Sequence, residues 1–258
     1  MTTKVFSISE ALRFGWNTTK SNLGFFIGLL IVFWLLLIVP FIIASEVSEI
    51  NIFLGFILQI ADYVLTMLIS MGLVKIVLSF CDNEKGKLSD LFSQYRLFFK
   101  YLATSILYFL IVFGGIILFI IPGIIWSIKF WFFDYFVIDK GLRPMEALKK
   151  SSAITQGVKW KLFTFFIVIS LININLLILS ATGFAISLDL FVFAPSTMLT
   201  AVIVLVASLL LISSFITVPT TMLARAFVYR KLLAQTEIVT TSQIVPQVAS
   251  QVAPEAIA

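Results

Sequence analysis

Long apolar runs alternate with short polar segments along this chain. A helix crosses the hydrocarbon core of a bilayer in about 20 residues, whereas the apolar core of a signal peptide has only about 7 to 15. The first run therefore indicates a retained span. The pattern predicts an all-α fold, a polytopic membrane helical bundle with about six transmembrane helices, over residues 23–44, 52–75, 101–121, 124–138, 162–180 and 198–223.

A turn must separate the third span from the fourth, because residues 97–138 form one nearly continuous apolar stretch. Gly114-Gly115 and Pro122-Gly123 both lie within it. Pro-Gly is the stronger turn signal, so we expect the turn at Pro122-Gly123 and a short fourth span. A turn at Gly114-Gly115 would instead leave Pro122 as a kink inside a longer helix.

Short amphipathic segments precede the first, third and fifth spans. The first begins with Ser7 and Glu10 in the spacing of a capping box. The second, residues 88–99, places its apolar side chains on one helical face. We expect these interfacial helices at the cytoplasmic surface. In the third, Pro144 and Glu146 suit a first helical turn, and the poorer apolar face predicts packing on protein.

The three units of interfacial helix and hairpin resemble one another. The tripeptide Glu-Ala-Leu at 10–12 recurs at 146–148, and Ser-Asp-Leu occupies 89–91 in the middle unit. Three helix-hairpin repeats would explain this similarity. An equally good interpretation is that any interfacial helix followed by a hairpin produces such a pattern.

The composition excludes a water-soluble protein. The chain of 258 residues is 60% apolar and only 12% charged, against about 25% charged in soluble domains. The last segment, 234–258, is rich in Gln, Thr, Ala and Val. We therefore divide the chain into an integral membrane domain, 1–233, and a disordered cytoplasmic tail, 234–258.

The distribution of charge predicts the orientation. Acidic residues, Glu46, Glu49 and Asp189, occupy two alternate connections between spans. The cations other than Lys129 gather in four segments, residues 4–20, 75–100, 140–161 and 225–231. By the positive-inside rule both termini lie in the cytoplasm, which predicts a multi-pass protein of the plasma (inner) membrane. Cations that flank spans attract anionic lipid headgroups, so we expect membrane lipids and not nucleic acid as partners.

Four polar residues inside the spans form a candidate intramembrane site. Gln59 and Asp62 lie in the second span, and Lys129 and Asp134 lie in the fourth. Charges at membrane depth cost several kcal/mol and often mark function. A separation of five places Lys129 and Asp134 on different helical faces, so we expect Asp62 to pair with Lys129. The pair is either structural or part of a solute pathway.

Smaller polar residues indicate helix contacts. Asn173 and Asn175 point in different directions from the fifth span and suit hydrogen bonds between helices. Thr220-Thr221, like Gly114-Gly115, would let helices approach closely. These features require no ligand.

The residue inventory argues against an enzyme. The chain has no His, which excludes His-based zinc sites and Ser-His-Asp triads. It has no Gly-rich phosphate loop, no carboxylates with metal-ligand spacing and one cysteine, Cys81. We therefore expect no catalysis and no cofactor.

A stretch of about 40 residues carries a family resemblance. Ile-Pro-Gly precedes a helix that ends in an acidic residue, a helix with Glu-Ala-Leu and Ser follows, and Gly-x-x-Trp enters the next span. The motif residues are Pro122, Gly123, Glu146, Ser151, Gly157 and Trp160. The pattern resembles a bacterial and archaeal group of six-span proteins that includes YciC-like proteins and the membrane domain of some glycerophosphoryl diester phosphodiesterases.

The resemblance implies an integral membrane protein of largely undefined role, with Gly157 and Trp160 at a helix-to-span corner. Phosphodiesterase activity does not follow, because that activity belongs to a barrel domain absent from this sequence. Our leading hypothesis is a non-catalytic lipid-contacting scaffold or accessory module, which would work with an unidentified membrane protein partner. The alternative is a small-solute or ion permease that uses Asp62 and Lys129.

Overall fold

The computed structural model describes residues 6–174, 178 and 197–252, and this part of the chain contains helices and no strand. It confirms the predicted all-α class. The helices are α1 (Ile8–Ser21), α2 (Leu23–Ile50), α3 (Ile52–Cys81), η1 (Leu88–Phe92), η2 (Tyr95–Leu97), α4 (Phe98–Leu118), α5 (Ile120–Lys129), α6 (Phe133–Lys140), α7 (Pro144–Thr155), α8 (Lys159–Ile172) and α10 (Thr197–Val252).

Five helical stretches are long and apolar enough to cross a membrane, and a sixth is added if the pair α7 and α8 counts as one bent span. The two helices of that pair meet at 101°. These numbers agree with the predicted bundle of about six spans. The stretches are Leu23–Ile50, Ile52–Cys81, Leu88–Leu118, Ile120–Lys140 and Ser208–Ile238.

The buried residues gather where the helices meet and not along the spans. We call this packed centre the hub; it comprises α1, residues 69–79 of α3, α6, α7 and residues 223–232 of α10. Its middle holds stacked aromatic rings, with the ring centroids of Tyr135 and Tyr229 5.0 Å apart. Apolar burial of this kind is the main stabilising term in folding.

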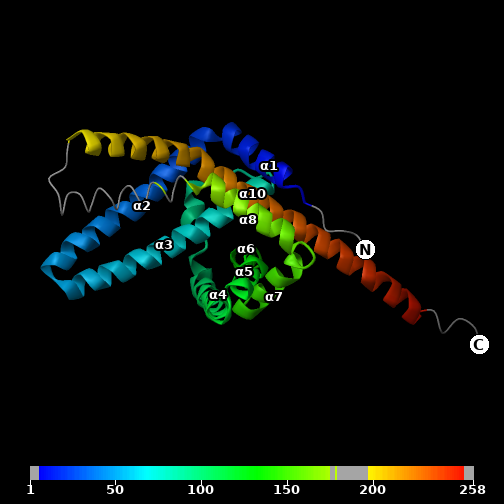
Figure 1. The fold of residues 1–258 in the computed structure, drawn as a ribbon. Helices are drawn as coiled ribbons and strands as arrows, with labels where there is room; N and C mark the ends of the chain where they lie inside the picture. Colours follow the sequence, from blue (N-terminus) through cyan, green and yellow to red (C-terminus); the bar gives the residue numbers. More distant parts are fainter. Residues whose placement is uncertain (1–5, 175–177, 179–196, 253–258) are drawn as a thin grey trace, which may run out of the picture.

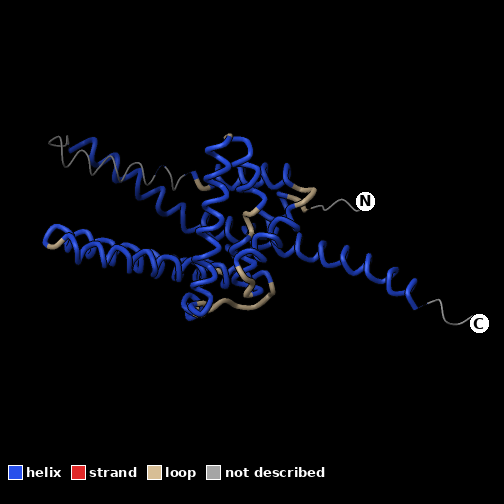
Figure 2. The backbone as a smooth tube through the Cα atoms, turned by 90° about the horizontal axis from the view of Figure 1, so that it is seen from below, coloured by secondary structure: helices blue, strands red, loops and turns tan. Residues whose placement is uncertain are grey.

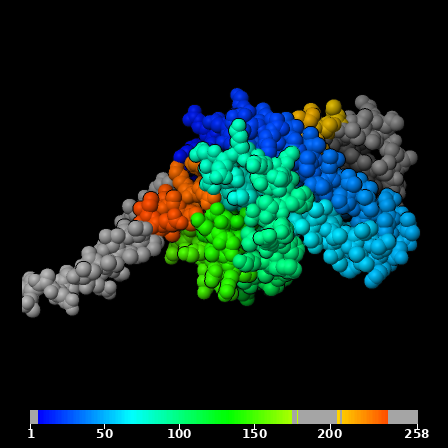
Figure 3. Space-filling model, turned by 180° about the vertical axis from the view of Figure 1, so that it is seen from behind, coloured from blue at the N-terminus to red at the C-terminus, as the bar shows by residue number. Residues whose placement is uncertain are grey.

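The α2–α3 hairpin leaves the hub as a long arm (Figures 1 and 3). Only 17% of the most apolar 18-residue stretch of α2 is buried inside the structure. In α3, large apolar side chains such as Phe53 remain exposed, Phe53 by 72%. Apolar surface of this extent needs a partner other than water. The arm therefore has the surface of a lipid-facing span.

Asn51 terminates α2 and begins α3. Its side chain accepts hydrogen bonds from the backbone amides of Phe53 and Leu54 at 3.0 and 3.1 Å, which satisfies two donors that a helix start leaves unbonded. One turn later, a Cβ on Gly55 would lie 2.4 Å from the Cβ of Ser48. The missing side chain lets the two helices approach closely beside the turn.

The turn between the third and fourth spans lies at Phe119, in extended conformation at φ −161° and ψ 142°. The predicted turn at Pro122-Gly123 is wrong. Pro122 lies in the first turn of α5, where its missing amide hydrogen costs nothing. Gly123 instead serves packing, because a Cβ there would lie 2.4 Å from the Cγ1 of Ile116 in α4, and Gly115 lies directly opposite it.

The interfacial segments only partly match expectation. α1 is a helix, but Ser7 bonds the hydroxyl of Ser9 and forms no capping box. The segment predicted as one helix over 88–99 instead contains two 3₁₀ turns, η1 and η2, and the first two residues of α4. The chain is drawn close to α3 there, since a Cβ on Gly72 would lie 2.3 Å from the Cα of Leu91.

The last helix differs from the predicted tail. α10 continues through residues 234–252 without a break (Figure 2), and residues 253–258 lie outside the described part. Extending an existing helix requires no new nucleus, so even a polar, weakly helical sequence can prolong it. Two of the three predicted hairpins, α2–α3 and α4–α5, lie in the described residues. The third connection falls outside the described residues, so the repeat stays a prediction.

Candidate functional site

A buried ion pair in the hub joins α10 to α6. Arg225 donates to both carboxylate oxygens of Asp134, at 2.9 and 3.1 Å, and to the carbonyl oxygen of Trp131 at 2.6 Å. The guanidinium also lies 5.1 Å from the ring centroids of Trp131 and Tyr135. Arginine suits a buried ion pair because its planar guanidinium presents a fork of donors and also stacks on aromatic rings. Arg225 is therefore anchored from several directions.

A second pair follows one turn further along α10. Arg230 bonds both oxygens of Asp139 at 2.8 and 2.9 Å and reaches Asp82 at the end of α3 at 2.6 Å. The hydroxyl of Tyr229 donates to Asp139 at 3.0 Å. Lys231 pairs with Glu10 of α1. The segment 225–231 thus ties α10 to α1, α3 and α6.

These pairs are not predicted from the sequence, because Arg225 and Arg230 lie in a cluster of cations at the end of a span, where cations usually face headgroups. A signal was present. Asp134 and Asp139 are separated by five residues, and Arg225 and Arg230 have the same separation. Two helices that face each other and run in the same direction bring such equally spaced opposite charges together. Each acid and each base then finds its partner about 91 residues away along the chain.

The predicted pair between Asp62 and Lys129 is not formed. Asp62 is buried with 9% of its surface exposed, and its Oδ1 atom has no hydrogen-bond partner in the described structure. The ammonium of Lys129 lies over the ring of Phe130, 5.1 Å from its centroid. Gln59 is half-buried one turn from Asp62. Within the described part of the chain, Asp134 is the one predicted site residue that meets an opposite charge, and its partner is Arg225.

Ser151 and Thr155 of α7 form hydrogen bonds with the backbone at the break between α5 and α6. Both hydroxyls donate to the carbonyl oxygen of Lys129, at 3.2 and 3.1 Å, and the Ser151 hydroxyl accepts from the amide of Phe132 at 3.1 Å. These bonds satisfy backbone groups that the break leaves free. The motif serine therefore has a structural role in fixing how α6 departs from α5.

The remaining motif residues shape the corner between α7 and α8. Glu146 lies at the other end of α7, where it accepts a hydrogen bond from the amide of Arg143 at 3.4 Å. Pro144 and Glu146 both lie in the first turn of this helix, as predicted. Gly157 adopts φ +85° at the corner, a conformation that favours glycine. Trp160, just after the corner, is 83% exposed.

Asn173 forms the interhelical hydrogen bond expected of it. Its amide nitrogen donates to the hydroxyl of Thr221 on α10 at 3.0 Å. Asn175 lies outside the described residues. Thr220 also supports close packing, since its carbonyl oxygen faces Gly15 of α1 and its hydroxyl lies 3.3 Å from that of Thr19.

Most cations of the described chain form no ion pair with a carboxylate. Ion pairs to carboxylates involve Lys140, Arg225, Arg230 and Lys231 alone among the described Lys and Arg residues. No group of three or more His, Cys, Asp or Glu residues in the described part could hold a metal ion.

No family model, curated protein or solved structure matches the chain. The resemblance to YciC-like proteins stays a prediction that rests on the motif residues.

Proposed function

We propose that the protein is a non-catalytic, multi-pass protein of the plasma (inner) membrane that serves as a lipid-contacting scaffold. In this proposal the hub lies at the cytoplasmic surface, with both termini on that side, and the apolar arms enter the bilayer. Anionic headgroups surround the rim of the hub. An accessory role beside another membrane protein is compatible with the same arrangement.

One observation carries the proposal: each of the three units exposes an aromatic ring beside a cation that has no ion pair in the described structure. In α1, Trp16 is 48% exposed and lies one turn before Lys20. In η2, Tyr95 is 58% exposed next to Arg96. Trp160, 83% exposed, adjoins Lys159. Aromatic rings favour the headgroup level, and cations there attract anionic lipids.

The internal pairing of the hub supports the same conclusion. Four cations neutralise carboxylates inside or beside the hub. The positive charge that remains is carried by side chains at its rim, such as Lys149 and Lys161, both exposed. Each lysine near an anionic membrane surface contributes about 1 kcal/mol of attraction. Several such residues together produce a measurable preference for anionic lipid.

Native mass spectrometry of the whole chain, released from nanodiscs of equimolar phosphatidylglycerol and phosphatidylcholine, tests this proposal. We expect phosphatidylglycerol to dominate among the retained lipids. The triple variant Lys20→Gln, Arg96→Gln and Lys161→Gln is expected to reduce that preference while leaving the hub pairs untouched. Equal retention of the two lipids by the unmodified chain would contradict the proposal.

The permease alternative keeps one supporting observation, the unpartnered Oδ1 of buried Asp62. A polar path through Asp62 and Lys129 has no support from their contacts, because the two residues form no pair. Liposome flux assays on Asp62→Asn address this alternative. Loss of a solute or proton flux in the variant would favour it over the scaffold.

A further inference from the structure

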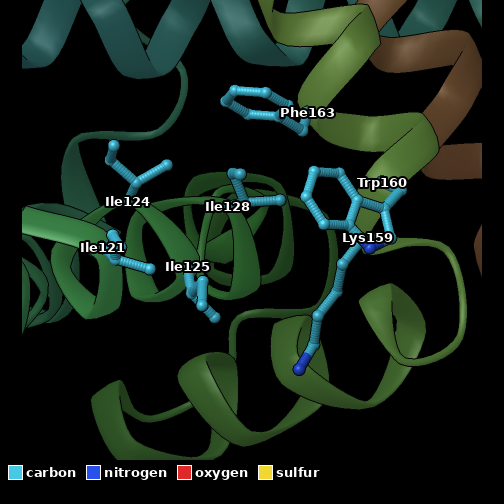
Figure 4. A pocket seen from close by; sticks show the side chains of 7 residues that line it. All are labelled: Ile121, Ile124, Ile125, Ile128, Lys159, Trp160 and Phe163. Carbon is cyan, nitrogen blue, oxygen red and sulfur yellow. The ribbon is translucent and has the colours of Figure 1, made fainter.

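An apolar groove lies between α5 and α8. Its volume is about 380 Å³, within the range of about 300 to 1,000 Å³ typical of small-ligand sites. Figure 4 shows isoleucine side chains of α5 facing the rings of Trp160 and Phe163, with Lys159 along one edge. The lining residues are Ile121, Ile124, Ile125, Ile128, Lys159, Trp160 and Phe163.

The groove runs along α5 and is long enough to hold part of a lipid chain. From Ile128, near the hub, to Ile121, near the Phe119 turn, α5 advances seven residues, or about 10 Å. All four isoleucines lie within the candidate span Ile120–Lys140. Ile121, Ile124 and Ile125 are 71%, 42% and 42% exposed, so the groove opens sideways towards the surroundings of the span.

One end of the groove carries the chemistry of a headgroup site. Lys159 is exposed and forms no ion pair among the described residues. In Figure 4 its side chain passes below the ring of Trp160, and its ammonium lies at the end of the groove away from Phe163. A tryptophan at this position favours the headgroup level of a membrane, where a lysine meets phosphate. The apolar side chains and the cation therefore follow each other along the groove in the same order as the acyl chain and the phosphate of a phospholipid.

A smaller hollow repeats this composition in the first unit. It has a volume of about 190 Å³ and is lined by Trp16, Thr19, Lys20, Leu23 and Ile216. The same combination of tryptophan, lysine and aliphatic side chains thus occurs beside two different spans, and the larger groove lies at α5 and α8.

We propose that the α5–α8 groove binds one anionic phospholipid, with an acyl chain along the isoleucines of α5 and the phosphate paired with the ammonium of Lys159. The inference rests on the proposed lipid-contacting function and narrows it to one site. A lipid bound in this groove would stay with the purified protein, unlike the lipids that surround any membrane protein. The bound molecule belongs to the inner leaflet, because Lys159 lies on the hub side of the groove.

The test uses native mass spectrometry of the full chain from the same equimolar nanodiscs, with variants of wall and cation. Ile125→Trp fills the groove, and Ile117→Trp is its control on α4, where residue 117 is 68% exposed. Lys159→Gln removes the headgroup contact, and Lys149→Gln is its control on exposed α7 surface. Lys159→Gln changes only an exposed side chain, so the result does not depend on tolerance of the larger tryptophan.

The expected result is one phosphatidylglycerol retained per unmodified chain, with retention about fivefold weaker in Lys159→Gln, as a single lysine contact predicts. Ile125→Trp weakens it by at least as much, and Ile117→Trp matches the unmodified chain. Lys149→Gln removes a rim charge outside the groove, so it weakens retention clearly less than Lys159→Gln does. If the unmodified chain prefers phosphatidylglycerol but Lys159→Gln and Ile125→Trp retain it equally well, the groove assignment fails while the scaffold proposal stands. If the unmodified chain shows no preference, both fail. A second protein chain in place of the lipid overturns the groove assignment.

Discussion

Removing Asp134 is expected to destabilise the hub more than any exposed charge change. In Asp134→Leu the guanidinium of Arg225 loses both carboxylate bonds, at 2.9 and 3.1 Å, in a place where its side chain is only 26% exposed. Leaving one partner of a buried pair uncompensated costs about 3 to 5 kcal/mol. Arg225 keeps the carbonyl of Trp131 and two aromatic rings, so we expect about 3 kcal/mol, at the low end of that range.

The double variant Asp134→Leu with Arg225→Met shows whether the two side chains stabilise the hub as a pair or independently of each other. Replacing a buried ion pair by apolar side chains of similar size is often neutral or stabilising. We therefore expect the double variant to recover most of the loss, with an interaction energy of about 2 kcal/mol or more. The control is Lys231→Met. Lys231 and Glu10 also form an ion pair, but at 32% and 49% side-chain exposure its loss should cost less than about 1 kcal/mol.

The assay is the free energy of unfolding in mixed micelles, measured by titrating sodium dodecyl sulfate into a mild detergent. Tryptophan fluorescence reports the transition, since Trp131 stacks on Arg225 in the folded hub. Losses in the two single variants that add within about 0.5 kcal/mol in the double variant would refute the pairing argument. An equal loss in Lys231→Met would refute the claim that burial makes the difference.

Three further predictions use the same unfolding assay. Gly15→Ala places a Cβ within 2.2 Å of the Thr220 carbonyl oxygen, so it should lower the free energy of unfolding by about 1 to 3 kcal/mol. Gly24→Ala is the control, because open space surrounds Gly24, and it should leave the free energy of unfolding unchanged. Equal effects of the two variants would contradict the close contact of α1 with α10. Asp62→Leu should raise the free energy of unfolding by about 1 to 3 kcal/mol, because it removes a buried oxygen without a hydrogen-bond partner; a loss of stability would show that Asp62 has a partner. Gly157→Ala should cost about 1 to 2 kcal/mol from its left-handed backbone alone, and an unchanged midpoint would mean that the corner relaxes.

The spans could be predicted from the sequence because hydropathy accumulates over many residues and tolerates local errors. The turn at Phe119 could not, because one dipeptide fits two structures. Proline is favourable in a Pro-Gly turn and equally so in the first turn of a helix. The choice depends on Gly115 and Gly123, which meet across the hairpin. That contact is tertiary and leaves no local pattern.

The hub pairs were hidden for a similar reason. Asp134 was recognised as unusual because it lies within an apolar stretch, but its partner Arg225 is 91 residues away. Arg225 stands beside Arg230 and Lys231 and therefore has the pattern of a topology signal. The Asp62 prediction failed because proximity between spans was assumed, whereas Lys129 turns toward Phe130. Asn173 was predicted correctly, since a lone amide in a span has few alternatives to bonding a neighbouring helix.

In the proposed function the hub lies at the cytoplasmic surface and the α2–α3 arm crosses the bilayer. The accessibility of engineered thiols tests this placement. In a Cys81→Ser background, Glu46→Cys places a thiol beside the far end of the α2–α3 arm, and Lys87→Cys places one just before η1, at the hub end of α3. Both native side chains are exposed. In intact cells that express the chain, a membrane-impermeant maleimide should label only the thiol at position 46, and permeabilisation should expose the thiol at position 87. Labelling at position 87 before permeabilisation, with protection at position 46, would contradict the account.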